Sequence, residues 1–215
     1  MPAPKSPEIT CTLCSRKFTD RGIARHLSTC LEKNTSKIAN TNSKKEVFLY
    51  LNISTGINGD PYWLHVVMDQ NATLRVLDNF LRDIWLECCG HLSCFYDGRP
   101  FKSKELDMDA KIGHVLKPRQ SISYIYDFGS STALLISARS QHQGKLKNTS
   151  GIDLLVRNPD PQILCEKCHK NVAEFVDPED MLFLCSECLD GTESDQEFLL
   201  PVVNSPRCGV CAYEG

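Results

Sequence analysis

Alternating apolar and polar side chains in the middle of the chain predict a β-hairpin. The alternation runs over residues 121–126 and again over 133–137, with a break at 127–131. A hairpin this apolar needs another layer to cover it. The one long amphipathic helical stripe, at residues 73–89, lies in the same part of the chain, so we expect it to pack on the hairpin.

Further elements precede this hairpin. In chain order they are strands at residues 47–53 and 62–68, a helix at 73–89, a strand at 92–96 and a short helix at 109–116. The order is β-β-α-β, a short helix and then the β-β hairpin. It predicts an α+β fold for residues 46–157, a roll of the ubiquitin-like, β-grasp-like kind.

The N-terminal segment, residues 1–31, carries a complete set of zinc ligands. Cys11 and Cys14 have the C-x2-C spacing of a metal knuckle, and His26 and Cys30 follow as H-x3-C. A two-residue gap lets both thiolates of a tight turn face one ion, while positions i and i+4 of a helix share one face. A segment this short needs the metal to fold, so we predict a structural Zn²⁺ here.

The same segment resembles the C2HC zinc finger family, because Phe18 lies four residues after the second Cys and Ile23 three residues before His26. Members of that family bind nucleic acid or protein, so the resemblance implies a ligand of one of these classes. Residues 32–45 are polar and lack periodicity. They predict a flexible linker, from which the finger would be tethered rather than packed.

A run of Asn, Pro and Asp at residues 158–161 marks the start of a C-terminal module, residues 158–215. Its ligands come from two C-x2-C pairs separated by sixteen residues: Cys165, Cys168, Cys185 and Cys188. Two knuckles from facing hairpins form a closed tetrahedral site, so this pattern predicts a zinc-ribbon-like module and brings the total to two Zn²⁺ per chain. Cys208 and Cys211 form a third C-x2-C, for which packing, a ligand role and a redox dithiol stay open.

The central and C-terminal residues also resemble a known family. The sequence that carries the resemblance is a Pro-Tyr-Trp strand start, the stretch at 73–98 and the YDFG motif, which is Tyr126, Asp127, Phe128 and Gly129. These residues look like the plasmid pRiA4b ORF-3-like family over residues 46–215. The acidic residue and the Trp that usually follow the Gly are replaced at 130–132 by Ser, Ser and Thr. The resemblance implies an accessory protein of the plasmid or mobile-element type and brings no enzymatic activity with it.

The composition of the chain indicates the cellular compartment in which we expect the protein. The chain has 12 Cys, no stretch of about 18 apolar residues, and no signal-peptide core in its first ten residues. We therefore expect a cytoplasmic protein outside the membrane, whose cysteines bind metal rather than form disulfides.

The net charge of −3 hides an asymmetry between the two ends of the chain. Residues 1–46 hold nine Lys or Arg against four Asp or Glu, whereas residues 159–215 hold three against twelve. The basic end favours nucleic acid as ligand of a non-enzymatic binding protein. The predicted contacts are Arg16, Lys17, Arg21 and Arg25. The alternative is a protein-interaction adaptor, in which the acidic C-terminal module and the central α+β domain dock a protein and the finger is a protein-binding finger. The small net charge supports this alternative.

An enzyme is a further alternative. Asp127 could act with Glu87 and His91, or it could simply cap its own turn. Reactive side chains crowd the end of the predicted helix: Cys88, Cys89, His91 and Cys94. Core packing, a third metal site and a nucleophilic site are all open for that group. Both recognisable zinc sets already have four protein ligands, which leaves no open position for metal catalysis.

Overall fold

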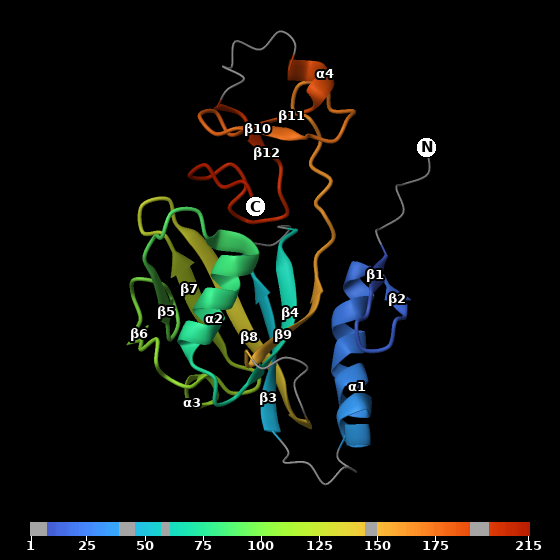
Figure 1. Cartoon of the computed structure of the whole chain (residues 1–215), viewed down its shortest axis with the longest axis vertical. Helices are drawn as coiled ribbons and strands as arrows, with labels where there is room; N and C mark the ends of the chain where they lie inside the picture. Colours follow the sequence, from blue (N-terminus) through green and yellow to red (C-terminus); the bar gives the residue numbers. More distant parts are fainter. Residues whose placement is uncertain (1–7, 39–45, 57–60, 145–149, 190–197) are drawn as a thin grey trace.

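A computed structural model describes the chain over residues 8–38, 46–56, 61–144, 150–189 and 198–215. Its centre is a seven-stranded sheet in which neighbouring strands run antiparallel. In spatial order the strands are β6 (Glu105–Leu106), β5 (Ser93–Tyr96), β7 (Ser121–Tyr126), β8 (Thr132–Gly144), β3 (Glu46–Ser54), β4 (Trp63–Asp69) and β9 (Ile152–Arg157). The chain is therefore a mixed α+β protein with mostly antiparallel sheets, as the sequence predicts (Figure 1).

The hairpin predicted from the alternating pattern is present and lies inside this sheet. Strands β7 and β8 pair from Ser121 opposite Ser137 to Tyr126 opposite Thr132. Strand β8 then runs on to Gly144 beside β3, although residues 139–144 are mostly polar. In this extension His142 and Gly144 are buried and Ser140 is half-buried, while the residues between them are exposed, which gives a polar sequence one covered face.

One face of the sheet is covered by helix α2 (Leu74–Leu81), which continues as a π-helical turn, η1 (Arg82–Leu86). Leu77, Leu81 and Trp85 from this helical stretch are fully buried in the main core. The helix ends at Leu86 instead of Cys89, because Glu87 is extended with a ψ of 116° and the chain turns at Gly90. The predicted extension of the helix to residue 89 is therefore wrong, and Cys88 lies beyond the helix, half-buried against the main core.

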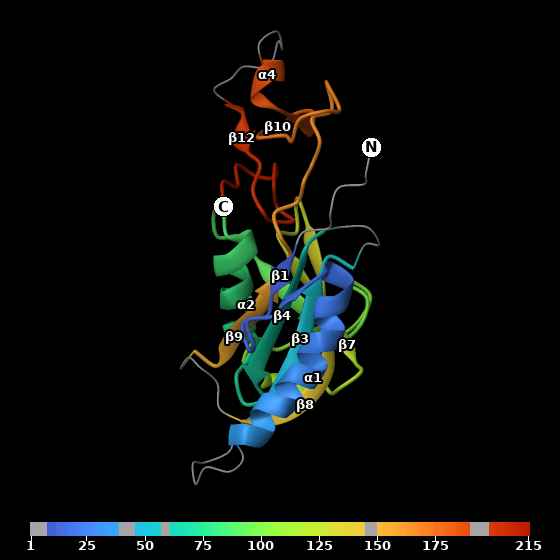
Figure 2. The ribbon, with the colours of Figure 1, turned by 90° about the vertical axis from the view of Figure 1, so that its right-hand side faces the viewer.

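The other face of the sheet is covered by helix α1 (Asp20–Ile38), which runs beside β3 and β8 (Figure 2). Ile23, Leu27 and Leu31 from the helix are buried with Tyr50 of β3 and Val67 of β4. Strand β3 is apolar on both faces. Phe48 and Tyr50 pack with α1, whereas Leu49, Leu51 and Ile53 enter the core beneath α2. A strand with two apolar faces needs a layer on each side.

The predicted flexible linker is wrong for residues 32–38, which belong to α1; residues 39–45 lie outside the described part of the chain. The finger is also packed on the sheet rather than tethered. The physical reason is that Leu31 extends the apolar stripe of Ile23 and Leu27 beyond the predicted metal ligands. Glu32 and Lys33, which follow Leu31, are exposed and do not interrupt the helix.

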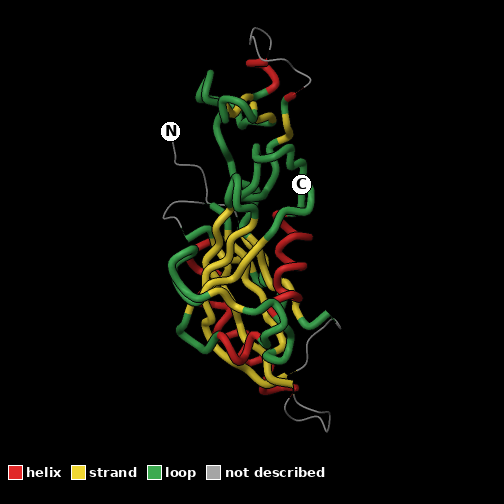
Figure 3. Tube along the Cα trace, turned by 90° about the vertical axis from the view of Figure 1, so that its left-hand side faces the viewer, coloured by secondary structure: helices red, strands yellow, loops and turns green. Residues whose placement is uncertain are grey.

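The remaining elements are short. Strands β1 (Ile9–Thr10) and β2 (Lys17–Phe18) form the finger hairpin, and helix α3 (Ile112–Val115) precedes β7. The C-terminal module, mostly loops and turns (Figure 3), contains β10 (Phe175–Asp177), β11 (Leu182–Leu184), helix α4 (Ser186–Leu189) and β12 (Leu200–Pro201). Among the described residues, no helix combines the length and apolar character needed to cross a membrane.

Candidate metal centres

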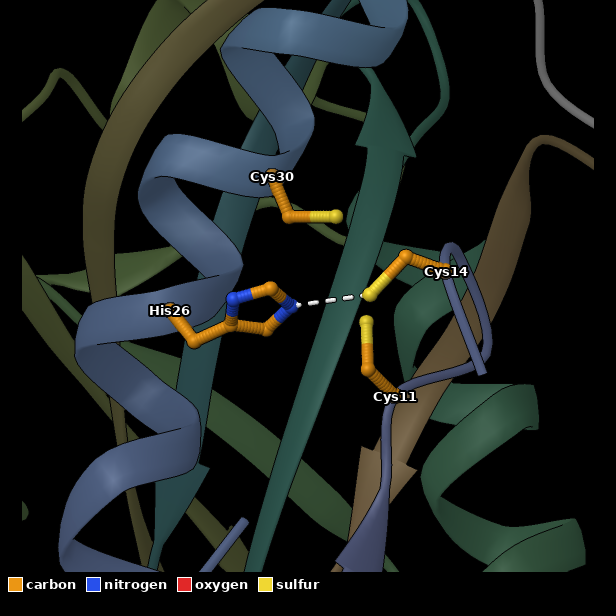
Figure 4. Close-up of side chains that lie close together, drawn as sticks. All are labelled: Cys11, Cys14, His26 and Cys30. Atoms are coloured by element: carbon orange, nitrogen blue, oxygen red, sulfur yellow. Dashed lines mark hydrogen bonds between the residues drawn. The ribbon is translucent and has the colours of Figure 1, made fainter. Parts of the chain in front are cut away.

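The first predicted zinc set is assembled in the structure. Cys11 and Cys14 lie on a tight turn in which Ser15 N–H donates to the Cys11 carbonyl at 2.8 Å, and His26 and Cys30 lie one helical turn apart on α1. The four ligand atoms lie within 4.8 Å of one another, and Cys14 Sγ is 3.2 Å from His26 Nε2 (Figure 4). The ring of Phe18 stacks on His26 at 3.9 Å between centroids and holds the imidazole in place.

The thiols of this set differ in how readily they ionise. Hydrogen bonds from the backbone and side chain of Arg16 lower the pKa of Cys14 to about 6. Burial, with added repulsion from Cys14 and Cys11, raises the pKa of Cys30 to about 12. One thiolate therefore forms below neutral pH, while a second is opposed by its neighbours. A bound divalent cation would cancel this repulsion, so the donor set fits a metal ion.

The second predicted set is also assembled. Cys165 and Cys168 come from one turn, and Cys185 and Cys188 from the end of β11 and helix α4. Their sulfur atoms lie within 4.8 Å of one another, with Cys168 and Cys185 3.9 Å apart. Asn171 Nδ2 donates to Cys185 Sγ at 3.7 Å, a contact of the kind that orients a metal ligand.

Electrostatics in this second set resemble those in the first. Burial raises the pKa of the Cys165 thiol, but backbone N–H donors of Cys168, Cys185 and Lys167 lower it more, to about 6. Sharing a hydrogen bond with Cys185 is the largest of the causes that raise the pKa of Cys188 to about 12. The chemistry of four clustered thiols again fits a thiophilic ion such as zinc.

A third cluster is present that the sequence left open. Its members are Cys88, Cys89, His91 and Cys211, whose ligand atoms lie within 4.8 Å of one another. Two residues considered with them lie apart from it. Cys94 Sγ contacts the carbonyl of Phe95 at 3.3 Å, and Cys208 is buried with its sulfur 3.4 Å from Val203 N.

The YDFG motif forms the turn between β7 and β8. Asp127 adopts a left-handed φ of 64°, and its Oδ1 accepts a hydrogen bond from Gly129 N–H at 2.8 Å. This is the turn cap that the sequence offered as one of two roles for Asp127. Tyr126 is buried and donates from its hydroxyl to Glu87 at 3.1 Å, whereas Phe128 is about half exposed.

The residues of the enzyme alternative do lie together, but each carboxylate has a structural partner. Asp127 Oδ2 accepts from Arg207 Nη2 at 2.6 Å and lies 3.5 Å from His91 Nε2. Glu87 accepts from Arg82 Nη1 at 2.6 Å. The hydrogen bond from Arg207 holds the pKa of Asp127 below its ordinary value, so this carboxylate is a weak base at neutral pH.

Arg207 is the residue that the sequence did not single out. It is fully buried, and its guanidinium reaches Asp127, the carbonyl of Ser130 and the hydroxyl of Thr132. The guanidinium also lies over the ring of Tyr126, 4.8 Å from the ring centroid. A single Arg between Pro206 and Cys208 carries no periodic signal, so only the tertiary structure shows its role.

The basic residues predicted to contact nucleic acid are exposed at the N-terminal finger: Arg16, Lys17, Arg21 and Arg25. Lys17 forms a salt bridge with Glu8 at 3.0 Å, and Arg16 interacts with the thiol of Cys14. Arg21 and Arg25 lie one turn apart on α1, on the side of the helix opposite the buried stripe. These two residues present the clearest positive charge of the finger.

Comparisons with known proteins add a distant structural similarity. No family model matches the chain, and no curated protein matches it. Among solved structures, the chain is similar to the crystal structure of a protein of unknown function, MM3350, from Methanosarcina mazei Go1. The two share 18% sequence identity with a TM-score of 0.41, over 48% of this chain and 65% of that chain.

Proposed function

We propose that this protein is a zinc-binding, non-enzymatic binding protein whose N-terminal finger associates with nucleic acid. The observation that carries the proposal is the two-sided character of α1. Its apolar side is buried on the sheet, and its metal ligands fix the helix to the β1–β2 hairpin. Arg21 and Arg25 are thereby held outward on a rigid support, which is the arrangement that phosphate contacts require.

The proposal includes the identity of the ions and of the family. Clusters of Cys and His at tetrahedral spacing favour zinc, one ion in the finger and one in the zinc-ribbon-like module. The order β3, β4, α2, β5 supports a β-grasp-like roll of the pRiA4b ORF-3-like kind. An accessory role in the cytoplasm, of the plasmid or mobile-element type, agrees with a basic finger.

Pairing of the carboxylates argues against the enzyme alternative. Asp127 is held by Arg207 and Glu87 by Arg82, so neither is poised to take a proton from a substrate. The adaptor alternative is favoured by one observation, the negative charge of residues 159–215. This segment contains twelve acidic residues and three basic ones. A segment of this charge would repel nucleic acid and suit a basic protein partner.

Electrophoretic retardation at low ionic strength separates these alternatives. The zinc-loaded full chain should retard both a labelled DNA duplex and a labelled single-stranded RNA, since phosphate contacts dominate. Arg21→Ala/Arg25→Ala should weaken retardation of both. Lys102→Ala/Lys104→Ala is the matched control, because it removes the same charge from an exposed loop before β6. Failure of the full chain to retard either polymer would favour the adaptor.

A further inference from the structure

We propose that the third cluster is a metal site that ties the C-terminal tail to the central domain. Its ligands are the sulfur atoms of Cys88, Cys89 and Cys211 and the Nε2 atom of His91. Three thiolates and one imidazole select a thiophilic divalent ion that accepts tetrahedral coordination, with zinc the first choice. This inference is independent of what the N-terminal finger binds.

The distances within the cluster match a tetrahedral site. Zinc bonds of about 2.3 Å to sulfur and about 2.0–2.1 Å to nitrogen imply ligand separations of roughly 3.8 Å for two sulfurs and roughly 3.5 Å for sulfur and nitrogen. Cys89 Sγ lies 3.8 Å from Cys88 Sγ and 3.7 Å from Cys211 Sγ. His91 Nε2 lies 3.0 Å from Cys89 Sγ and 3.3 Å from Cys211 Sγ.

The two other zinc sets of the same chain provide an internal comparison. Their measured separations are 3.9 Å between Cys168 Sγ and Cys185 Sγ and 3.2 Å between Cys14 Sγ and His26 Nε2. The third cluster therefore has the dimensions of sets whose ligand spacing identifies them as metal sites. Core packing does not account for it, because Cys89 and Cys211 are exposed.

Local backbone conformation brings three of the ligands together. The chain leaves η1 at Glu87, whose Oε1 accepts a hydrogen bond from Gly90 N–H at 2.5 Å, and Gly90 has a left-handed φ of 80°. This tight turn directs Cys89 and His91 toward the same point. A side chain at position 90 would strain the turn.

The fourth ligand is placed by a tail that is anchored before it reaches the site. Ser205 Oγ donates to the carbonyl of Trp85 at 2.6 Å, and Arg207 binds Asp127 at 2.6 Å. Left-handed backbone at Gly209 and at Cys211, with φ values of 78° and 53°, then turns the chain back toward His91. Both segments that supply ligands, the turn at residues 87–91 and the tail at residues 205–211, are therefore held by hydrogen bonds.

Charge around the cluster suits thiolates. The Nε–H of Arg207 is buried without a hydrogen-bond partner among the described residues, and the guanidinium interacts electrostatically with Cys88. A second guanidinium, that of Arg82, lies 4.8 Å from the centroid of the Tyr126 ring, whose hydroxyl is 3.8 Å from Cys88 Sγ. Both guanidinium groups also pair with carboxylates, Arg207 with Asp127 and Arg82 with Asp78 and Glu87, so they offset only part of the net negative charge that three thiolates leave around a divalent ion.

The three sites differ in exposure, and this sets their order of metal loss. The first and second sets each have two buried ligands, whereas no ligand of the third cluster is buried. A chelator should therefore remove the third ion first. Its removal should release the tail between Ser205 and Tyr213 while the other modules keep their metal.

Native mass spectrometry of the zinc-loaded full chain tests the site. We expect three zinc ions for the wild type, two for Cys89→Ser/Cys211→Ser, and three for the control Cys94→Ser, whose thiol lies outside the cluster. Two ions in the wild type, or three in the double variant, would overturn the proposal. A Cys89–Cys211 disulfide in place of the third ion would also overturn the proposal. The polypeptide mass would then be 2 Da lower than that of the fully reduced chain.

Thiol alkylation provides a readout that needs no variant. In the zinc-loaded wild type, Cys89 and Cys211 should resist alkylation despite their exposure, and a brief treatment with chelator should make them the first thiols to react. Rapid alkylation of both before any chelator is added would contradict a bound metal.

Discussion

Arg207 donates a hydrogen bond to Asp127 at 2.6 Å and so joins the C-terminal tail to the turn of the β7–β8 hairpin. The two residues are 80 positions apart in sequence, and both are buried. A buried carboxylate and a buried guanidinium each need the other, because an unpaired charge inside a protein is strongly unfavourable. The YDFG turn therefore has a structural role in positioning the tail that carries Cys211.

Replacing Arg207 by Leu should lower the melting temperature and expose the tail, because Asp127 would lose its charged partner. Hydrogen exchange should rise at residues 203–213 and around Asp127. The control is Arg139→Leu, which removes an exposed guanidinium bonded to Asn52 and should change little. Unchanged exchange of the tail in Arg207→Leu would show that the ion pair does not hold it.

The same pair predicts a dependence on pH with a defined sign. The native pKa of Asp127 is depressed by Arg207, so its contribution to stability is complete above the unfolded value of about 3.9 and is lost as pH falls through the native pKa. Asp127→Asn should therefore be less stable than the wild type at pH 7, and the difference should shrink at pH 3. Urea unfolding at the two values measures it.

His65 should stay neutral well below its ordinary titration range. Burial, with a smaller effect of Arg139, lowers the pKa of this histidine to about 4, and Tyr50 Oη lies 2.9 Å from its Nδ1. Because the folded pKa is depressed, the free energy of unfolding should fall as pH drops from about 6.5 toward 4, by up to about 1.4 kcal/mol per unit. His65→Gln should lack this part of the pH dependence.

The control for that measurement is His114→Gln, because His114 is exposed. Urea unfolding at pH 7 and pH 5.5 should show the wild-type loss of stability in His114→Gln and a smaller loss in His65→Gln. Neither substitution touches the three Cys/His clusters, so acid release of any bound metal cancels in the comparison. Equal losses in the two variants would refute a neutral, buried His65.

Docking of the finger predicts a stability effect beyond the finger itself. Leu27 is fully buried between α1 and the sheet, so Leu27→Ala should lower the free energy of unfolding by about 2–5 kcal/mol and raise hydrogen exchange in β3. Thr29→Ala on the exposed side of the same helix should change the unfolding free energy by less than about 0.5 kcal/mol. Normal protection of β3 in Leu27→Ala would support a tethered finger instead.

Features that depend on residues close together in the chain could be predicted from the sequence. Alternation located β7 and the first part of β8, and ligand spacing identified the sets around Cys11 and Cys165, because the residues involved are close in the chain. The docked finger was missed although one signal was visible. Phe48 and Tyr50 make the second face of β3 apolar, and the polar residues after Leu31 concealed the length of α1.

Relationships between distant residues were not predictable in the same way. Cys211 is 120 residues from His91, and Arg207 is 80 residues from Asp127. No periodic or spacing pattern links such pairs, since their proximity depends on where the C-terminal tail crosses the end of the sheet. Cys88 and Cys89 are adjacent and lack the knuckle spacing that makes the other sets recognisable.

The most direct test of the proposed function is the salt dependence of nucleic-acid binding, measured by fluorescence anisotropy with a labelled duplex and the zinc-loaded full chain. The wild type should bind weakly, with affinity that falls steeply as salt rises. Arg21→Ala/Arg25→Ala should flatten the slope of log K against log salt by up to about 2 units, whereas Lys102→Ala/Lys104→Ala should leave it unchanged. No binding at low salt, or an equal loss of slope in the two variants, would contradict nucleic-acid association through the finger.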